Sequence, residues 1–273
     1  MKQKYAQNQY ETWDDKAKVI VNWVCGDMDG TKNSLMSNEE KHQLIQYVTD
    51  FKFMPGGRYL WYAGREARYF NNCYMLRLED DTREEWAGLS QRAMSCLMTG
   101  GGIGADVSLC RPGGRALRRT GGVSSGPLPL LYTLNEIGRN VMQGGSRRSA
   151  LYGSMDAGHG DIWELLHAKN WSDIPIEGSE LSIADAKKFN FNYHAPLDMM
   201  NISLNYGDEW LNGGQDDIFM ENCKQALMTG EPGFSFNFGD KKGETLRNAC
   251  TEITSEDDSD VCNLGSVNLA NID

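Results

Sequence analysis

The amino-acid sequence predicts an α/β fold in which parallel strands alternate with helices. Four segments have the apolar or alternating pattern of strands, and they begin near residues 71, 151, 199 and 233. Helical spacing of apolar residues marks the segments between them, at residues 82–99, 127–143 and 216–230. Thr82 and Glu85 have the spacing of a capping box at the start of the first of these helices. Strands separated by helices pair in parallel, so these observations predict the α/β class.

The first 53 residues predict a helical region without a motif that carries chemistry. Helical patterns are found there at residues 12–26 and 37–53. Ser37 and Glu40 form a second candidate capping box, in which each side chain bonds the backbone of the other. The Pro-Gly-Gly sequence that follows predicts a turn before a strand of aromatic residues, within residues 54–64.

Composition excludes several classes of protein. The chain has 273 residues, 40% of them hydrophobic, which suits one large or two small domains. Its 38 acidic residues outnumber 27 basic ones, and a net charge of −11 argues against general binding to nucleic acid or acidic membranes. No apolar run approaches the ~20 residues of a membrane span, and the polar N-terminus lacks a signal-peptide core. We therefore expect a cytoplasmic protein, of its own cell or of a host cell if it is viral.

Neither the cysteines nor the histidines form a recognisable ligand set. The seven cysteines show no C-x-x-C pair and no regular framework, which argues against a disulfide-stabilised secreted protein. The four histidines are scattered, so we expect no metal site. His159 and Asp161 resemble a catalytic pair, but they precede a helix; this favours Asp161 as a helix-start residue and His159 as a structural residue.

Asn248, Cys250 and Glu252 occupy every second position of one segment. If the segment is extended, alternation puts an amide, a thiol and a carboxylate on one face, within reach of one small substrate. The alternative is an ordinary strand with a buried cysteine, since free Cys is among the most buried residue types. The alternating run at residues 261–269 is expected to form the last strand.

Four glycines stand in the sequence Thr-Gly-Gly-Gly-Ile-Gly-Ala-Asp at residues 99–106. They follow a helix, whereas a dinucleotide-binding fingerprint follows a strand and has another spacing. A helix C-cap accounts for only one glycine. The pattern therefore predicts a place where backbone closely approaches a substrate or another chain. Four arginines at residues 111–119 suit phosphate recognition, although a solvated loop explains them equally well.

Three separate motifs together resemble the large catalytic subunit of ribonucleotide reductases. Asn248, Cys250 and Glu252 match the Asn-x-Cys-x-Glu pattern of that family's finger loop. Cys262 in Cys-Asn-Leu-Gly-Ser-Val-Asn-Leu and Cys73 in Asn-Asn-Cys match its two redox cysteines.

The resemblance covers residues 50–273 and implies both a fold and an activity. Residues 54–273 would form the first half of a ten-stranded α/β barrel, including the finger loop, after an N-terminal helical region at residues 1–53. The implied activity is the reduction of ribonucleotides, as diphosphates or triphosphates, to deoxyribonucleotides for DNA synthesis.

The resemblance also implies a role for each matched residue. Cys250 would carry a thiyl radical that takes the 3′-hydrogen of the ribose. Glu252 would act as general base on the 3′-hydroxyl, and Asn248 would hold the substrate by its amide. Cys73 and Cys262 would supply the reducing equivalents and end as a disulfide. Implied contacts to the substrate come from Asn72, Gly101, Gly102, Asn248 and Glu252.

Two glycine-rich stretches resemble the loops through which reductases sense an effector, a deoxynucleotide or ATP. The first stretch includes Arg119, Thr120 and Gly121. The second includes Gly144, Gly145, Ser146, Arg147 and Arg148. Their composition suits a switching loop, although ordinary loops are equally rich in glycine.

The radical source is inferred from Trp61 and from spacing. Residues 55–64 resemble the Pro-x-Gly-Arg-x-Leu-Trp-x-x-Gly stretch of adenosylcobalamin-dependent reductases, and the interval from Cys250 to Cys262 is short, as in that class. The resemblance therefore implies adenosylcobalamin as cofactor. The alternatives are a class I large subunit that uses a separate metal radical subunit, a non-radical dithiol oxidoreductase, and a nucleotide-binding regulatory protein.

The same resemblance implies partner proteins. No second barrel half follows in this sequence, so we expect a C-terminal fragment that completes the barrel and without which this chain is inactive. The last expected strand, residues 261–269, would offer that fragment an unpaired edge. A thioredoxin-like reductant would reduce the disulfide. The interval between Cys73 and Cys250 lacks room for the large insertion of monomeric cobalamin reductases, so a homodimer is one alternative.

Overall fold

The computed structural model describes residues 5–6, 8, 11–26, 36–117, 121–141 and 149–272. The chain forms two compact units, Met1–Asn72 with Cys262–Asp273, and Cys73–Val261. Each is described separately below. The division at residue 53 that we expect for the catalytic domain stays a prediction.

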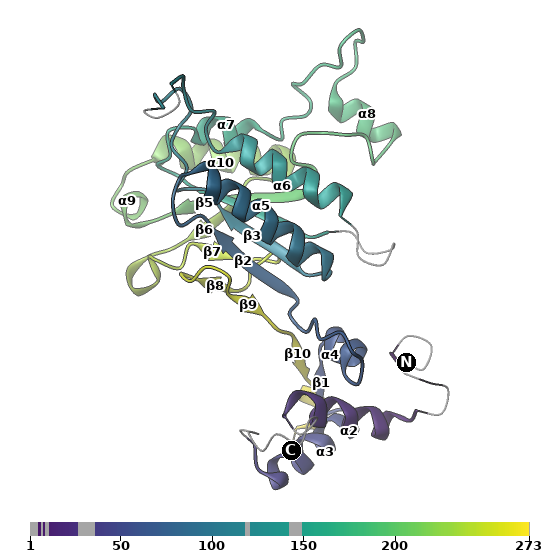
Figure 1. Cartoon of the computed structure of the whole chain (residues 1–273). Coiled ribbons are helices and arrows are strands. Elements are labelled where there is room, and N and C mark those ends of the chain that lie inside the picture. Colours follow the sequence, from purple (N-terminus) through teal and green to yellow (C-terminus); the bar gives the residue numbers. More distant parts are fainter. Residues whose placement is uncertain are drawn as a thin grey trace. The chain divides into compact units, whose positions relative to one another are not determined.

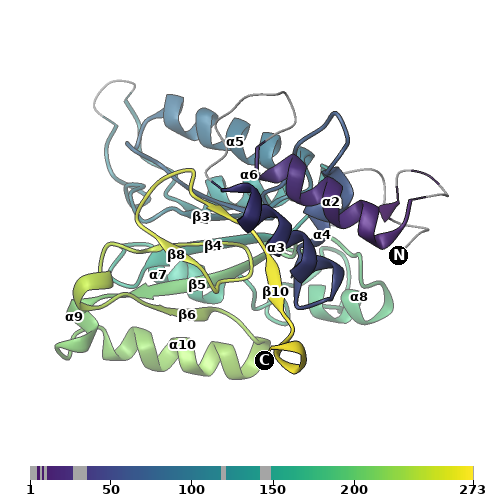
Figure 2. The same cartoon turned by 90° about the horizontal axis from the view of Figure 1, so that it is seen from below.

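The larger unit is built on a parallel sheet. Its strands are β2 (Cys73–Arg77), β3 (Gly102–Asp106), β4 (Leu151–Asp156), β5 (Met200–Tyr206) and β6 (Gly233–Phe236). They pair in the order β6-β5-β4-β3-β2, and all four pairings are parallel. Figure 2 shows β3, β4, β5 and β6 side by side. The predicted α/β fold is thereby confirmed.

A short segment extends the sheet beyond β2 and makes it mixed. The Met75 N–H donates to the Asp260 carbonyl at 2.9 Å, and the Ser259 N–H donates to the Met75 carbonyl at 2.8 Å. This segment leads into β9 (Val261–Cys262). The expected single strand over residues 261–269 is therefore shorter and begins beside β2.

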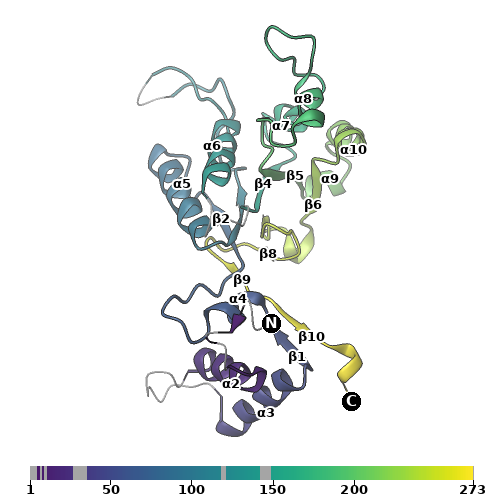
Figure 3. The same cartoon turned by 90° about the vertical axis from the view of Figure 1, so that its right-hand side faces the viewer.

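Helices cover one face of this sheet. They are α5 (Arg83–Met98), α6 (Leu128–Asn140), α7 (Ile162–His167) and α10 (Asp216–Thr229), with the shorter α8 (Ile183–Phe189) and α9 (Asp208–Leu211) beside them (Figures 1 and 3). The predicted helix start at Thr82 is confirmed, because its hydroxyl accepts from the Glu85 N–H at 3.2 Å. Leu89, Leu134 and Ile103 are fully buried between helices and sheet, as side-chain alternation along the strands requires.

The opposite face of the sheet is polar and carries a hairpin. Buried polar side chains line it from β4 to β6: Tyr152, Ser154, Ser203, Asn205 and Ser235. The antiparallel hairpin of β7 (Leu246–Arg247) and β8 (Thr254–Ser255) lies on this face, away from the helices (Figure 3). The two faces therefore have different roles, one forming the hydrophobic core and the other supporting the hairpin.

The smaller unit contains α2 (Trp13–Val24), α3 (Asn38–Thr49), α4 (Gly57–Tyr62), η2 (Leu269–Asn271) and a short antiparallel pair of β1 (Phe53–Pro55) and β10 (Gly265–Val267). The capping box at Ser37 and Glu40 is confirmed in both directions, at 2.7 and 3.2 Å. No helix in the described part of the chain combines the length and apolar character needed to cross a membrane.

One expectation for this unit is wrong. The aromatic run after Pro-Gly-Gly forms helix α4, not a strand, because Leu60 packs into a small core with Ile20 and Ala63. The last strand has a partner on one side, since β10 pairs with β1 from Phe53↔Val267 to Pro55↔Gly265. Among the described strands β10 has no second neighbour, so the edge that we expected to be unpaired is open on its other side.

Candidate active site

Asn248, Cys250 and Glu252 lie in the turn that joins β7 to β8. The expectation of an extended segment is wrong, because the Thr251 N–H donates to the Asn248 carbonyl at 3.0 Å and closes a tight turn. Thr251 itself has a φ of 72°, in the left-handed region. The Asn248 side-chain Oδ1 also accepts the Ile253 N–H at 3.2 Å. The three residues are consequently not on one face: Asn248 is buried, whereas Cys250 and Glu252 are exposed.

The hairpin lies directly on the glycines of β3. A Cβ at Gly104 would stand 1.8 Å from the Arg247 carbonyl oxygen, and one at Gly102 would stand 2.8 Å from the Ala249 Cβ. Only glycine leaves room for such an approach. The close backbone approach that the sequence predicts is therefore present, and the approaching backbone is the chain's own hairpin. The contact of Gly101 and Gly102 with substrate stays a prediction.

Two side chains that sequence reasoning missed hold the base of the hairpin. Asp106, at the end of β3, accepts from the Thr245 hydroxyl at 2.7 Å and from the Ser108 N–H at 2.9 Å. Burial raises the pKa of the Asp106 carboxyl. The Arg247 guanidinium donates to Ser235 Oγ at 2.9 Å and to Asn237 Oδ1 at 3.0 Å. The sequence carries no local signal for the bond from Thr245 to Asp106, because these two residues lie 139 positions apart.

Cys73 lies on the same face of the sheet as the hairpin. It is opposite Gly102 in the register of β2 and β3, and paired residues of parallel strands project to the same side. Since Gly102 faces Ala249, Cys73 is next to the turn that carries Cys250. Cys73 is buried, at 6% exposure. The structure thus brings Cys73 and the Asn248–Glu252 turn together on one face of the larger unit.

Cys262 and Asn72 belong to the smaller unit. Cys262 is buried, and its carbonyl accepts from the Asn72 N–H at 2.8 Å. The Asn72 side-chain oxygen is also buried. The pairing of Cys73 with Cys262 and the contact of Asn72 with substrate stay predictions.

The Asn248 amide has an unused donor. The side chain is completely buried, and Nδ2 has no hydrogen-bond partner among the described residues. A buried donor without a partner costs about 1–3 kcal/mol, so such groups in native proteins call for an explanation. A ligand oxygen at the turn is one partner that would satisfy it.

The expected effector loops are only partly visible. Arg119, Thr120, Gly144, Gly145, Ser146, Arg147 and Arg148 lie outside the described residues. Gly121 adopts a left-handed φ of 70°, and the Leu117 N–H donates to the Gly122 carbonyl at 3.0 Å. The ends of the second loop are joined, because the Ser149 hydroxyl donates to the Val141 carbonyl at 3.0 Å. The effector role of both loops stays a prediction.

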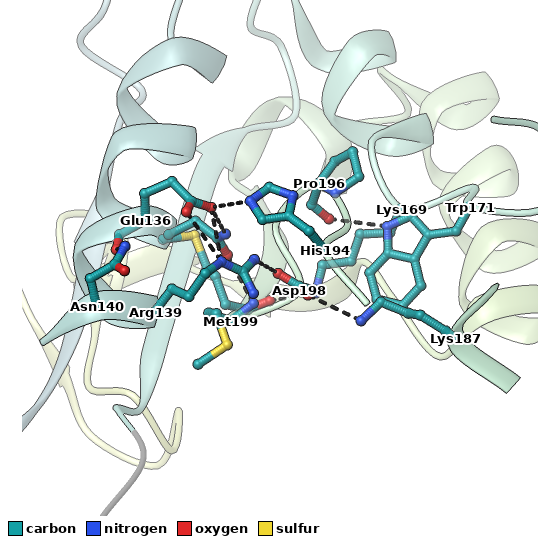
Figure 4. A network of polar contacts seen from close by, with 12 residues as sticks. Glu136, Arg139, Asn140, Lys169, Trp171, Lys187, His194, Pro196, Asp198 and Met199 are labelled. Atoms are coloured by element: carbon teal, nitrogen blue, oxygen red, sulfur yellow. Dashed lines mark hydrogen bonds and ion pairs between the residues drawn. The ribbon is translucent and has the colours of Figure 1, made fainter. Parts of the chain in front are cut away.

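A network of charges fixes the end of α6 just before the second loop (Figure 4). Asp198, at 5% side-chain exposure, pairs with Arg139 of α6 and with Lys187, the latter at 3.0 Å. Burial alone would raise the pKa of Asp198, but the hydrogen bonds from Arg139 and Lys187 lower it overall. On the other side, Glu136 accepts from Arg139 and contacts His194 Nε2 at 3.0 Å. The helix end that precedes residues 142–148 is therefore held in place by these charges.

His159 is structural, as expected. Its Nε2 is 2.7 Å from the Cys110 carbonyl, and its Nδ1 accepts the Asp161 N–H at 3.1 Å. Asp161 holds the N-cap position of α7 without capping it, because its carboxylate accepts the Gly113 N–H at 2.8 Å instead. Among the described residues, no three His, Cys, Asp or Glu side chains gather in a way that could hold a metal ion.

Known proteins resemble this chain in sequence and in fold. Relatives include the vitamin B12-dependent ribonucleoside-diphosphate reductase of Mycobacterium tuberculosis, 28% identical over 233 residues, or 82% of this chain and 33% of that protein. The ribonucleoside-diphosphate reductase subunit alpha of Chlamydia muridarum is 26% identical over 263 residues, or 81% of this chain and 25% of that protein. The chain thus spans a third or less of these relatives.

A solved structure has the same fold. The alpha subunit of the Actinobacillus ureae class Id ribonucleotide reductase superposes with a TM-score of 0.69 at 20% identity, covering 98% of this chain and 48% of that one. The family model of the ribonucleotide reductase barrel domain matches residues 71–211, more than half of the chain and all of β2 to β5. The chain therefore belongs to the ribonucleotide reductase barrel-domain family.

Proposed function

We propose that this chain is part of a catalytic subunit that reduces ribonucleotides to deoxyribonucleotides by thiyl-radical chemistry. The observation that carries the proposal is the hairpin, which presents Cys250 at an exposed turn on the polar face of a reductase barrel domain. Cys73 lies on the same face, beside this turn. In the proposal, Cys250 carries the radical and Cys73 is one of the two reducing thiols.

The proposed reaction balances with three thiols and one carboxylate. The Cys250 thiyl radical takes the 3′-hydrogen, which forms an S–H bond and leaves a radical on the ribose. Glu252 accepts the 3′-hydroxyl proton and returns it to the 3′-oxygen later in the cycle. The 2′-hydroxyl leaves as water with one proton from the cysteine pair, and the other hydrogen of the pair goes to C2′. Cys73 and Cys262 supply two electrons and two protons and become a disulfide, after which Cys250 gives back its hydrogen atom. The unpaired Asn248 Nδ2 is a suitable donor to a substrate oxygen.

The radical source that we favour is adenosylcobalamin. When bound, this cofactor supplies the one-electron oxidation that turns a thiol into a thiyl radical. Cys250 is exposed, so a radical source that lies outside the described residues can reach its sulfur. The Trp61 motif and the short interval from Cys250 to Cys262 favour the cobalamin class. The relatives include both a B12-dependent enzyme and an alpha subunit that is not described as B12-dependent. The radical source is therefore tested by reconstituting enzyme activity with adenosylcobalamin. Activity with a diiron or dimanganese protein instead of adenosylcobalamin would overturn this assignment.

The radical assignment is tested by Cys250→Ala in the enzyme supplemented with its partner polypeptide. We expect reduction to be abolished while nucleotide binding, measured by equilibrium dialysis, is kept. Cys223→Ala on α10 is the matched control and should keep activity, since Cys223 is half-buried away from the hairpin. Turnover by Cys250→Ala at a rate comparable with the control would exclude the proposed radical role.

The redox pair has its own test. After one turnover without external reductant, we expect peptide mass mapping to recover Cys73 and Cys262 joined by a disulfide. A thioredoxin-like protein should then restore activity. Recovery of both as alkylated thiols after turnover would count against the pair.

A second polypeptide is proposed to complete the barrel. The chain spans a third or less of its curated relatives, and among the described strands β6 pairs with β5 alone. Beside β6, α10 exposes Met220, Leu227 and Met228 at 59–89%. An open strand edge next to apolar side chains is a surface that another chain can pair with and cover. This edge is additional to the open side of β10 at residues 265–267.

The partner requirement predicts that the 273-residue chain with nucleotide, effector, dithiol and adenosylcobalamin forms no deoxynucleotide. Addition of the downstream polypeptide should start the reaction, because a thiyl radical needs an enclosed site. Deoxynucleotide formed by the chain alone would show that the partner is unnecessary. Sedimentation of the assembled enzyme would show whether it is a homodimer.

A further inference from the structure

The side chain of Arg247 joins the hairpin to the far edge of the sheet. Its backbone carbonyl lies over Gly104 of β3, whereas its guanidinium reaches β6, three strands away in the sheet order. There Nε donates to Ser235 Oγ at 2.9 Å. The terminal nitrogen donates to Asn237 Oδ1 at 3.0 Å and to the Phe236 carbonyl at 3.4 Å.

The acceptors of this guanidinium are themselves rigidly held. Ser235 and Asn237 are 2% and 3% exposed, and the Asn237 Nδ2 donates back to Ser235 Oγ at 3.3 Å. The Asn237 N–H also donates to the Tyr206 carbonyl at 2.9 Å, which ties this end of β6 to β5. A planar donor fork held by fixed acceptors on one strand has little freedom to move.

Arg247 is also directly connected to the turn that carries Cys250. Asn248 follows Arg247 and provides both the carbonyl that closes the turn and the side-chain oxygen that binds the Ile253 N–H. A movement of the Arg247 peptide therefore moves the whole turn. The other contact that holds the hairpin is the hydrogen bond from the Thr245 hydroxyl to Asp106. It fixes only the start of β7, so the hairpin could still rotate about this point.

We propose that Arg247 is a positioning residue, which sets the place of the Cys250 sulfur by holding the hairpin across the sheet from β3 to β6. The inference rests on the proposed function for its catalytic consequence, but not for its structural one.

The structural test is electron paramagnetic resonance of a nitroxide attached to Cys250. The half-buried Cys25, Cys96 and Cys223 are replaced by serine so that the exposed Cys250 is the site labelled. We expect Arg247→Met to narrow the nitroxide lines through greater mobility of the turn. Arg247→Lys should recover part of the immobilisation, because lysine supplies a donor but no planar fork.

The matched control is Arg139→Met. Arg139 is likewise partly buried, but its guanidinium is ion-paired with Glu136 and Asp198, away from the hairpin. It should leave the Cys250 spectrum as in the parent protein. If Arg247→Met does not fold, as judged by circular dichroism, Ser235→Ala is used instead. It removes the acceptor of Arg247 Nε, together with the weaker bond from Asn237 Nδ2, and should give an intermediate spectrum. An unchanged spectrum in Arg247→Met, or in Ser235→Ala where that variant is used, would overturn the proposal.

The catalytic consequence is measured in the assembled enzyme. A displacement of about 1 Å at the reacting atom can cost on the order of 100-fold in rate. We expect Arg247→Met to lower kcat by about this factor, with KM for the nucleotide nearly unchanged and with partial recovery in Arg247→Lys. If the turn is mobile in Arg247→Met but the parent enzyme has no reductase activity, the proposed function is overturned and the positioning role of Arg247 stands. A mobile turn with unchanged kcat would overturn the positioning role itself.

Discussion

Replacing Gly104 by alanine should displace the hairpin. The new Cβ would stand 1.8 Å from the Arg247 carbonyl oxygen and 2.9 Å from its carbonyl carbon. Because carbon–oxygen contacts are not shorter than about 3.3 Å, the hairpin must retreat by about 1.5 Å. The nearby atoms are backbone, which cannot rotate away as a side chain can.

The expected cost follows from what this retreat disturbs. Overpacking of a tight site costs roughly 1–3 kcal/mol, and weakening the hydrogen bonds of Arg247 adds roughly 1.5 kcal/mol. The preference of a strand for alanine over glycine offsets roughly 0.5–1 kcal/mol of this. The free energy of unfolding should therefore fall by about 1.5–4 kcal/mol.

Urea unfolding followed by circular dichroism measures this loss. The control is Gly88→Ala in helix α5, where the nearest atom to the new Cβ, the Arg92 terminal nitrogen, is 3.9 Å away. That variant should gain about 0.5–1 kcal/mol, because alanine is the better helix former. A Gly104→Ala protein as stable as the parent, alongside a control that behaves as expected, would refute the tight contact.

Two other predictions concern buried charges. Burial raises the folded-state pKa of Asp106 above its ordinary value of 3.8, so its contribution to stability is complete below pH 3.8 and is lost as pH rises through the raised pKa. Asparagine does not titrate, so Asp106→Asn does not lose stability in this way as pH rises. The difference in free energy of unfolding, variant minus parent, should therefore increase from pH 4 to pH 7. Lys169→Met should cost about 2–4 kcal/mol in urea unfolding, because it strands Glu231, its partner at 2.8 Å, in a site where Lys169 is only 8% exposed. Lys188→Ala, which removes an exposed ion pair with Asp185, should cause no measurable change.

The features that the sequence predicts well are local. The capping box at Ser37 and the helix start at Thr82 are each decided within four residues, so the sequence contains the whole interaction. Alternation of strands and helices likewise predicts the parallel sheet. The barrel-domain family is predicted from three short motifs because each motif is contiguous.

The features that it does not predict depend on contacts between distant segments. The bond from Thr245 to Asp106 spans 139 residues, and nothing near either residue marks it. Gly102 and Gly104 do indicate that another segment comes close to the backbone. The absence of their side chains does not identify which segment occupies that space. Arg247 presents the same difficulty, because its acceptors on β6 are ordinary strand residues.

The shape of the Cys250 turn is where alternation predicts the wrong geometry. Asparagine can bond nearby backbone with its side chain and so compete with an extended strand, and Asn248 does so with the Ile253 N–H. The price of the turn is a left-handed Thr251, at φ 72°, a conformation that costs a β-branched residue roughly 1–2 kcal/mol.

This difference in geometry gives opposite signs for one substitution. If the segment is the turn described, Thr251→Gly relieves the left-handed strain and should raise the free energy of unfolding by up to about 1 kcal/mol. If the segment were an extended strand, glycine would instead lower it by roughly 0.5–1 kcal/mol. Urea unfolding of Thr251→Gly and of Thr251→Ala distinguishes the two, since alanine keeps the strain and should stay close to the parent. A clear loss of stability in Thr251→Gly would show that Cys250 lies on an extended segment, and that Asn248, Cys250 and Glu252 share a face after all.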